Sequence, residues 1–293
     1  MRLERETMLN IYKIYKYFVI LCVICAIVQS CNIINPKEQV PTYIHIDSFQ
    51  FEGAATHEIS AIVVYYNNNP VGSFDLPATF PIIATGTGSL LITPAINSNG
   101  QNDRLTQYPF YTQDTSTFTA QPGKVINYTP KTTYVASAKF YTISDFEYGQ
   151  IKLTKAAGDV AITDVTDPSL IFQGNGTGSI YLAAVGDSSV DSSNTPFNIT
   201  PGAAFIEFDY RTEIPFDLAL QSNLGALYNS GANYIAGVNP VNPTTKWRKF
   251  YLDLTGVVNQ TPGDNYTFFM NAYLADSQTH GRLLIDNIKL VTF

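Results

Sequence analysis

Alternating apolar and polar positions run through most of this chain and predict short β-strands separated by turns, with almost no helix. Residues 43–51 alternate in this way, and residues 59–66 form an apolar run that ends at the turn 67–70. The asparagines of that turn tolerate positive backbone angles, so residues 71–76 should return as the partner strand of a hairpin. Further short strands are expected over residues 89–92, 108–111, 117–120, 125–128 and 133–142.

The second half of the chain carries longer alternating segments. In residues 205–211 the odd-numbered side chains oppose the even-numbered ones, and one of the two sets must face another sheet. Residues 247–254 repeat the pattern. Strands at this spacing predict an all-β chain of two tandem β-sandwich domains, the first (43–137) immunoglobulin-like or prealbumin-like and the second spanning 138–293.

The N-terminus has the order of an export signal. Basic residues come first, residues 17–28 are uncharged and apolar, and Gln29 and Ser30 precede Cys31. The apolar run is shorter than the roughly 20 residues that a permanent membrane helix needs. Residues 1–30 are therefore expected to be a cleaved signal peptide, and residues 31–42, which contain two prolines, a tether.

The segment Val28-Gln29-Ser30-Cys31 resembles the lipobox of bacterial lipoproteins, in a form more typical of Bacteroidetes because Gln29 replaces the usual small residue. The resemblance implies cleavage before Cys31, a lipid anchor of several acyl chains such as palmitate on that residue, and localisation to the outer membrane, on its cell-surface or periplasmic face. The alternatives are an ordinary secretory signal with an incidental cysteine and an uncleaved anchor helix.

Cysteine usage and charge exclude several classes of site. Two of the three cysteines, Cys22 and Cys25, lie in the leader, so the mature chain can form neither a disulfide framework nor a cysteine-based zinc site. Removal of residues 1–30 takes away four basic and two acidic groups and changes the net charge from −7 to −9. No basic stripe remains to neutralise a phosphate backbone, so a nucleic-acid partner is not expected.

Two further segments resemble known families. Residues 62–77, a strand followed by a polar turn, Val-Gly and Leu-Pro, are similar to PEGA-type surface modules, which implies an interaction or spacer domain. Asp145-Phe146-Glu147 and the run 284–290 resemble the first and last strands of jelly-roll carbohydrate-binding modules and galactose-binding-like domains. That resemblance implies a jelly roll for residues 138–293 and a non-catalytic binding module, with glycan the first ligand to consider.

The same resemblance implies two functional features. Jelly rolls of this type hold a structural Ca²⁺ with positions that fall here on Glu147 and Asp286, and backbone carbonyls with Asp164 or Asp167 would complete the oxygen ligands. The alternative is a pair of solvated or hydrogen-bonded carboxylates. A tryptophan placed like Trp247 is more often a core residue in these modules than a platform for a sugar.

The loops of the second half carry the mixture of rings and amides that a neutral sugar requires. We predict that Tyr228 and Tyr234 stack on the sugar while Asn233 and Asn239 bond to its hydroxyls, and Asn271 and Tyr273 belong to the same mixture. Two or more exposed rings would favour sugar. A flat apolar patch would favour the alternative function, a structural or adhesive cell-envelope protein that contacts protein partners.

No motif indicates catalysis. The histidines are isolated in sequence, and the glycine-rich segment 174–178 lacks the lysine of a phosphate-binding loop. Paired carboxylates for glycoside hydrolysis meet in space and not in sequence order, so the sequence does not exclude them. With few acidic residues and no enzyme-sized domain beside the two modules, we predict that the protein is not an enzyme.

Overall fold

The computed structural model describes residues 8, 12–21, 38–100, 105–222, 234–260 and 265–293. Residues 12–21 are helical, and otherwise these ranges contain strands, the short helix α4 (Thr255–Gln260) and the 3₁₀ turns η1 (Ser98–Gly100) and η2 (Glu147–Gly149). The predicted all-β fold is confirmed. Within these ranges no helix combines the length and apolarity needed to cross a membrane. Cys31 lies outside the described residues.

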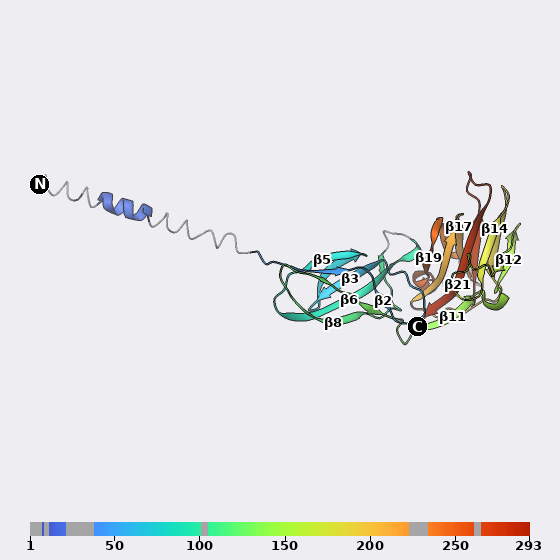
Figure 1. Cartoon of the computed structure of the whole chain (residues 1–293), viewed down its shortest axis with the longest axis horizontal. Coiled ribbons are helices and arrows are strands. Elements are labelled where there is room, and N and C mark those ends of the chain that lie inside the picture. The colour runs from blue at the N-terminus through green and yellow to red at the C-terminus, as the bar shows by residue number, and fades with distance from the viewer. Residues whose placement is uncertain (1–7, 9–11, 22–37, 101–104, 223–233, 261–264) are drawn as a thin grey trace.

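The first half forms two facing sheets and a small two-stranded one (Figure 1). One sheet has the order β5-β1-β9, with β1 at Thr42–Ile46, β5 at Ala78–Ile82 and β9 at Val125–Asn127. The other has the order β4-β3-β6-β7, with β8 also paired to β6; its strands are β3 (Ala61–Tyr66), β4 (Asn69–Asp75), β6 (Thr87–Asn97), β7 (Leu105–Gln107) and β8 (Asp114–Thr119). Strands β2 (Gln50–Phe51) and β10 (Lys131–Thr132) pair with each other.

Alternation places the core of this half between the two sheets. Ile44 and Phe80 on one sheet and Ile62 and Ile92 on the other are fully buried in one cluster. The predicted hairpin is confirmed as β3 and β4, joined where Asn67 and Asn68 adopt φ values of 48° and 63°. The expected single strand 43–51 is wrong in one respect: it divides into β1 and β2, because the two pieces pair with different strands.

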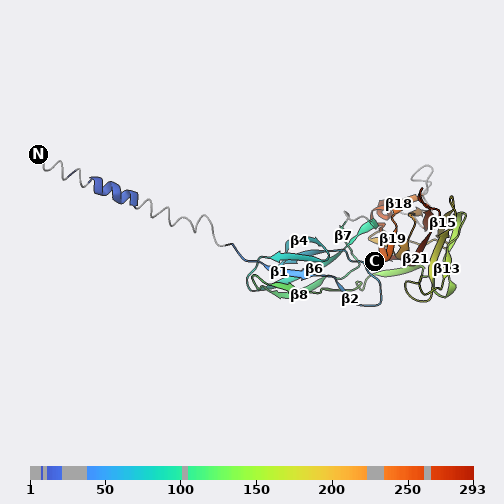
Figure 2. The same ribbon diagram turned by 45° about the horizontal axis from the view of Figure 1, so that its top comes forward.

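The second half is a sandwich of two larger sheets, seen from two directions in Figures 1 and 2. The open sheet has the order β12-β15-β20-β17-β18: β12 (Leu153–Gly158), β15 (Ser188–Ser193), β20 (Tyr266–Tyr273), β17 (Phe216–Ser222) and β18 (Tyr234–Val241). The junction sheet has the order β13-β14-β21-β16-β19, with β11 also paired to β21: β11 (Lys139–Ser144), β13 (Thr163–Val165), β14 (Thr177–Leu182), β16 (Ala204–Thr212), β19 (Thr244–Asp253) and β21 (Gly281–Thr292).

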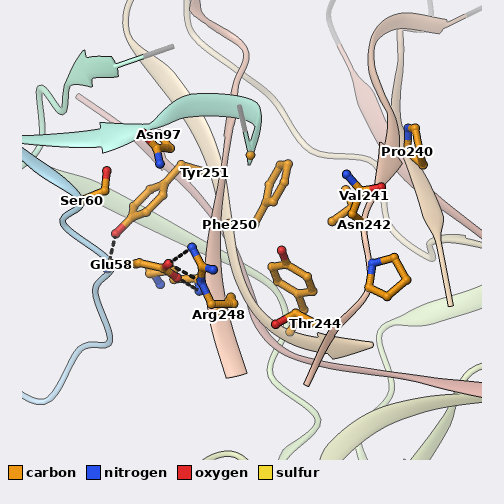
Figure 3. A pocket seen from close by; sticks show the side chains of 14 residues that line it. Glu58, Ser60, Asn97, Pro240, Val241, Asn242, Thr244, Arg248, Phe250 and Tyr251 are labelled. Carbon is orange, nitrogen blue, oxygen red and sulfur yellow. Dashed lines mark hydrogen bonds and ion pairs between the residues drawn. The ribbon is translucent and has the colours of Figure 1, made fainter. Parts of the chain in front are cut away.

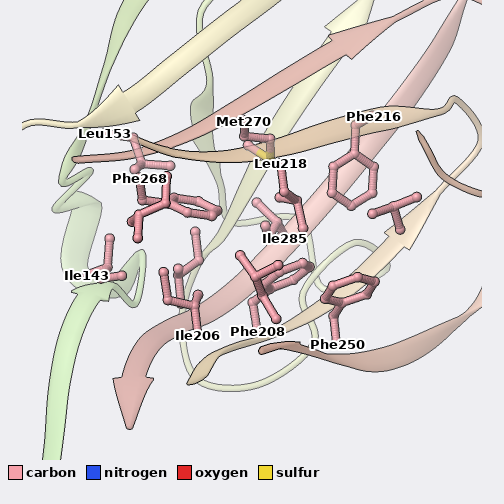
Figure 4. Close-up of a cluster of buried hydrophobic side chains, with 14 of the residues drawn as sticks. Ile143, Leu153, Ile206, Phe208, Phe216, Leu218, Phe250, Phe268, Met270 and Ile285 are labelled. Atoms are coloured by element: carbon pink, nitrogen blue, oxygen red, sulfur yellow. The ribbon is translucent and has the colours of Figure 1, made fainter. Parts of the chain in front are cut away.

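A layer of aromatic and aliphatic side chains fills the space between these two sheets (Figure 4). Phe208 and Phe250 of the junction sheet stack with ring centroids 5.1 Å apart and face Phe216 and Phe268 of the open sheet. Each ring of this size stabilises the fold by roughly 1.5–3 kcal/mol when it is fully buried. The sandwich therefore has its own core, separate from that of the first half.

The junction sheet is buried on its other face as well. There Phe205, Tyr251 and Val291 pack against a cluster of N-terminal residues, Ile96, Tyr108, Phe110 and Tyr111. The even-numbered set of β16 faces the sandwich core, as one of the two sets was expected to do. In the odd-numbered set, Phe205, Glu207 and Asp209 are also buried, because the N-terminal half covers them, whereas Arg211 at the far end of the strand is half-exposed.

Glu207 is the centre of this junction, and its side chain is fully buried. Its carboxylate accepts hydrogen bonds from the hydroxyls of Tyr108 and Tyr134, and it lies 3.0 Å from Lys249 Nζ and 3.3 Å from Lys289 Nζ. Burial raises the pKa of this carboxyl, but the two ammonium groups and the tyrosine hydroxyls outweigh burial and hold the pKa below its usual value. The charge is thus compensated from both halves of the chain.

We predict that Glu207→Gln lowers the free energy of unfolding by about 3 kcal/mol, because it leaves two largely buried ammonium groups without their counter-charge. Urea denaturation followed by tyrosine fluorescence measures the change. Glu52→Gln is the matched control: it removes the exposed ion pair with Lys131, and its expected effect is about 0–1 kcal/mol. Equal effects of the two substitutions would show that the buried cluster does not hold the halves together.

Candidate functional site

The outer face of the open sheet is the first candidate site. Along β15, β17 and β20 every second residue is buried in the core and the residues between are half-exposed. Strict alternation of this kind is expected when one face of a sheet packs on the core and the other meets solvent. The half-exposed side chains of the three strands therefore form one continuous surface.

Rings and hydrogen-bonding groups share this surface. The strand register places Asp217 opposite Asn271, and Ala219 opposite Phe269 one row further along. The hydroxyl of Tyr273 donates to Asp217 Oδ1 at 3.3 Å, and Asn271 Nδ2 donates to Asp217 Oδ2 at 3.5 Å. Desolvation, with the charge of Asp217 second, raises the pKa of Tyr273, so its hydroxyl stays protonated at neutral pH.

This arrangement offers two half-exposed rings, a carboxylate oriented by its neighbours and an amide on one face of a sheet. Such a surface can hold a ligand that has an apolar face and a rim of hydroxyls. Because the groups stand on paired strands and not on loops, their spacing is determined by the strand register.

The predicted loop residues fall partly outside the described residues. Tyr228 and Asn233 lie in the segment 223–233, which the structure does not describe. Tyr234 and Asn239 belong to strand β18, beside β17 in the open sheet, and only their backbone is described. The prediction that these residues lie in loops is therefore wrong for Tyr234 and Asn239.

Asn271 and Tyr273, which sequence reasoning also grouped with the loops, stand on β20. Sequence reasoning missed Asp217 and Phe269. The alternation in residues 216–222 and 266–273 was the available signal, because it puts these two side chains on the polar face of their strands.

The expectation that Trp247 is a core residue is also wrong. Trp247 is half-buried on the outer face of the junction sheet, where its ring packs on Phe172 with centroids 4.8 Å apart. The guanidinium of Arg211 lies 5.6 Å from the centroid of the indole ring. The outward position follows from alternation in β19, where Phe250 and Leu252 fill the core and Trp247 has the opposite parity.

A second candidate site is a cluster of oxygen atoms around the loop 173–177. Glu147 accepts hydrogen bonds from the backbone N–H of Asn175, 3.2 and 3.1 Å from its two oxygens. Asp286 is buried and accepts from Thr177 Oγ1 at 3.2 Å, and burial raises its pKa to about 7. The structure thus brings the two predicted metal ligands to the same loop.

Asp164, and not Asp167, is the further carboxylate at this loop. The Oδ1 atom of Asp164 is buried and lacks a hydrogen-bond partner among the described residues. A Cβ on Gly176 would clash with this oxygen and with the carbonyl oxygen of Phe146, so both atoms crowd the same point of the loop. Asp167 instead accepts hydrogen bonds from Ser169 and shapes a turn.

These donors fit a hard cation that prefers oxygen, provided that backbone carbonyls supply part of the ligand set. In the described part of the chain, no group of three His, Cys, Asp or Glu side chains gathers closely enough to hold a metal ion. Phe146 and Tyr148 have φ values of 56° and 54°, which are costly for residues other than glycine. Their conformation directs the carbonyl of Phe146 toward Asp164 and Gly176.

A pocket of about 280 Å³ lies where the two halves meet (Figure 3). Its charged groups are already paired: Glu58 accepts from the side chain of Arg248 and from the backbone N–H of Lys249. The backbone N–H of Glu58 donates to the hydroxyl of Tyr251 at 2.9 Å. Because these groups satisfy one another, we interpret the pocket as part of the junction and not as a ligand site.

Comparison with known proteins identifies no family for this chain: no family model matches, and no curated protein matches. Among solved structures, this chain is similar over part of its length to TmCBM61 in complex with β-1,4-galactotriose (18% identity, TM-score 0.38, covering 51% of this chain and 97% of that one). It is also similar to a family 30 carbohydrate-binding module of a Clostridium thermocellum cellulase (12% identity, TM-score 0.40, covering 52% and 96%). Likeness this low supports no conclusion about function.

Proposed function

We propose that this protein is a non-catalytic, surface-anchored binding module for glycan, and that the outer face of the open sheet is the binding surface. The observation that supports this proposal is that Phe269, Tyr273, Asp217 and Asn271 stand on the same half-exposed face of the paired strands β17 and β20. Rings bind the C–H face of a sugar, while the carboxylate and the amide bond to its hydroxyls.

Asp217 has the central role on this surface. Its two oxygens already accept from Asn271 and Tyr273, and each carboxylate oxygen has a further lone pair to offer. A sugar hydroxyl that donates to Asp217 can accept in turn from the amide of Asn271. The resemblance of residues 145–147 and 284–290 to jelly-roll carbohydrate-binding modules agrees with this assignment.

We predict that Phe269→Ala weakens the affinity for a bound glycan by about 1 kcal/mol, roughly fivefold, because it removes one stacking contact. Asp217→Ala should cost at least as much, since it leaves the sugar hydroxyls without their acceptor. A glycan array with the full-length protein identifies the ligand, and calorimetry measures the variants. Tyr43→Ala, which removes an exposed ring from the N-terminal half, is the control and should leave the affinity unchanged.

Two results would contradict this proposal in different ways. Unaltered affinity of both variants would move the glycan site away from the open sheet. No binding to any glycan on the array would favour the alternative function, a structural or adhesive envelope protein with protein partners.

The lipid anchor is part of the same proposal. We predict that Cys31→Ser shifts the protein from the membrane fraction to the soluble fraction, because the acyl chains on Cys31 would be its anchor. Fractionation after a high-salt wash, with Cys25→Ser in the leader as the control, measures the shift. A Cys31→Ser variant that still sediments with membranes would refute the lipoprotein assignment.

A structural Ca²⁺ is the third part. Asp164 and the carbonyl of Phe146, which approach the same point beside Gly176, are the donors that would hold it, and Glu147 and Asp286 at the same loop are the further ligands that the resemblance implies. We predict that a chelator lowers the melting temperature and that added Ca²⁺ restores it, since a ligand of the folded state alone stabilises that state by mass action.

The substitution Asp164→Asn should abolish this Ca²⁺ dependence, whereas Asp167→Asn, the matched control in the neighbouring turn, should retain it. A melting temperature that does not respond to chelator or to Ca²⁺ in the parent protein would exclude the site.

A further inference from the structure

The outer face of the junction sheet is divided into two parts. One end is buried under the N-terminal half, where Glu207 and Tyr251 contact Tyr108 and Tyr111. Further along the same strands, beyond the region that the N-terminal half covers, the face forms a groove of about 1000 Å³. Arg211 and Arg282 line this groove, together with Leu170, Glu213, Thr244 and Thr245.

The aromatic ring of Trp247 holds one of the two arginines of this groove in place. The guanidinium of Arg211 lies 5.6 Å from the centroid of Trp247, and that ring packs in turn on Phe172. One amino group of Arg211 donates to the carbonyl oxygen of Ser169 at 3.2 Å. A stacked guanidinium loses little further freedom when a ligand binds to its remaining N–H groups.

The second arginine is held in a similar way. The guanidinium of Arg282 lies 5.0 Å from the centroid of Tyr181, and the register pairs these two residues across β14 and β21. Arg211 pairs with Leu284, two positions along β21 from Arg282, so both arginines stand on the same face of neighbouring strands.

Neither guanidinium forms an ion pair with a carboxylate of the described residues within 4.0 Å, although the charge of the exposed Asp167 acts on Arg282. Glu213 lines the groove, but its carboxylate accepts from the backbone N–H of Arg282 at 3.0 Å. In a chain with a net charge of −7, a groove with two stacked and unpaired arginines is a local exception.

We propose that this groove binds the carboxylate of an acidic saccharide, a uronic acid unit within a polysaccharide. A guanidinium offers two parallel N–H groups that match the two oxygens of a carboxylate. The hydroxyls of Thr244 and Thr245 can bond to the hydroxyls of the sugar, and Leu170 and Pro243 can contact its C–H face. The three kinds of group on a uronate thus have counterparts in the groove.

This site is separate from the open sheet and does not depend on the binding surface proposed there. The two surfaces belong to different sheets of one sandwich, so they can be occupied independently.

The test measures binding of the full-length protein to polygalacturonate and to the same polymer after complete methyl esterification. We expect binding to the acid form, loss of most of that binding on esterification, and weakening at high salt. Arg211→Gln and Arg282→Gln should each lower the affinity at least tenfold. Lys155→Gln, which removes an exposed cation from β12 of the open sheet, is the matched control and should have no effect.

Glu213→Gln provides a test in the opposite direction. It keeps an acceptor for the backbone N–H of Arg282 and removes a negative charge from the groove, so we expect it to tighten binding of polygalacturonate. A role of the arginines in stability alone would not produce this gain.

Other polyanions decide how specific the groove is. If heparin bound more tightly than polygalacturonate, sulfate and not carboxylate would be the group that the groove binds. If poly-glutamate bound as tightly as polygalacturonate, the ligand would not be a saccharide. Either result would overturn the proposal. Equal binding of the acid and esterified polymers, or unchanged affinity in both arginine variants, would also overturn it. Phe269→Ala distinguishes the two surfaces, since it should weaken the glycan of the open sheet and leave the binding of polygalacturonate unchanged.

Discussion

The buried carboxylate of Glu207 is the constraint on which the arrangement of the two halves depends. It stands on β16 of the second half, and the tyrosine hydroxyls that bond to it come from the N-terminal strands and the connection that follows them. A buried carboxylate that loses such hydrogen bonds costs about 1–3 kcal/mol, so Glu207 is fully satisfied only when both halves are in place. Lys249 and Lys289 complete the compensation from within the second half.

This junction decides which surfaces of the sandwich remain available to ligands. It covers one end of the outer face of the junction sheet, and it leaves the open sheet and the groove near Arg211 and Arg282 to solvent. The uncovered surfaces differ in chemistry: the open sheet carries rings, a carboxylate and an amide, and the groove carries two cations. The two sites that we propose would therefore place neutral sugar units on one surface of the sandwich and acidic ones on another.

The oxygen cluster around the loop 173–177 belongs to the same sandwich and connects separate parts of it. The segment that leads into the second half, at Phe146 and Tyr148, adopts left-handed backbone conformations and faces a loop in which Gly174 and Gly176 leave no room for a side chain. These close approaches join the start of the second half to its last strand through Asp286. A cation at this point would stabilise the connection between the two halves and the sandwich.

Local patterns in the sequence were sufficient for the all-β class and the asparagine turn of the first hairpin, because periodicity and turn chemistry depend on neighbours along the chain. They were wrong for some strands, such as residues 108–111, where Tyr111 forms only an isolated bridge with Tyr134. A resemblance also indicated Glu147 and Asp286 as metal ligands, which stays a prediction, and the structure places both at the loop 173–177. Alternation could not reveal that both faces of β16 are buried over residues 205–209, nor that Trp247 supports Arg211 outside the core. Only the tertiary structure decided these points, because burial of an outward face depends on a partner that folds from residues about a hundred positions away.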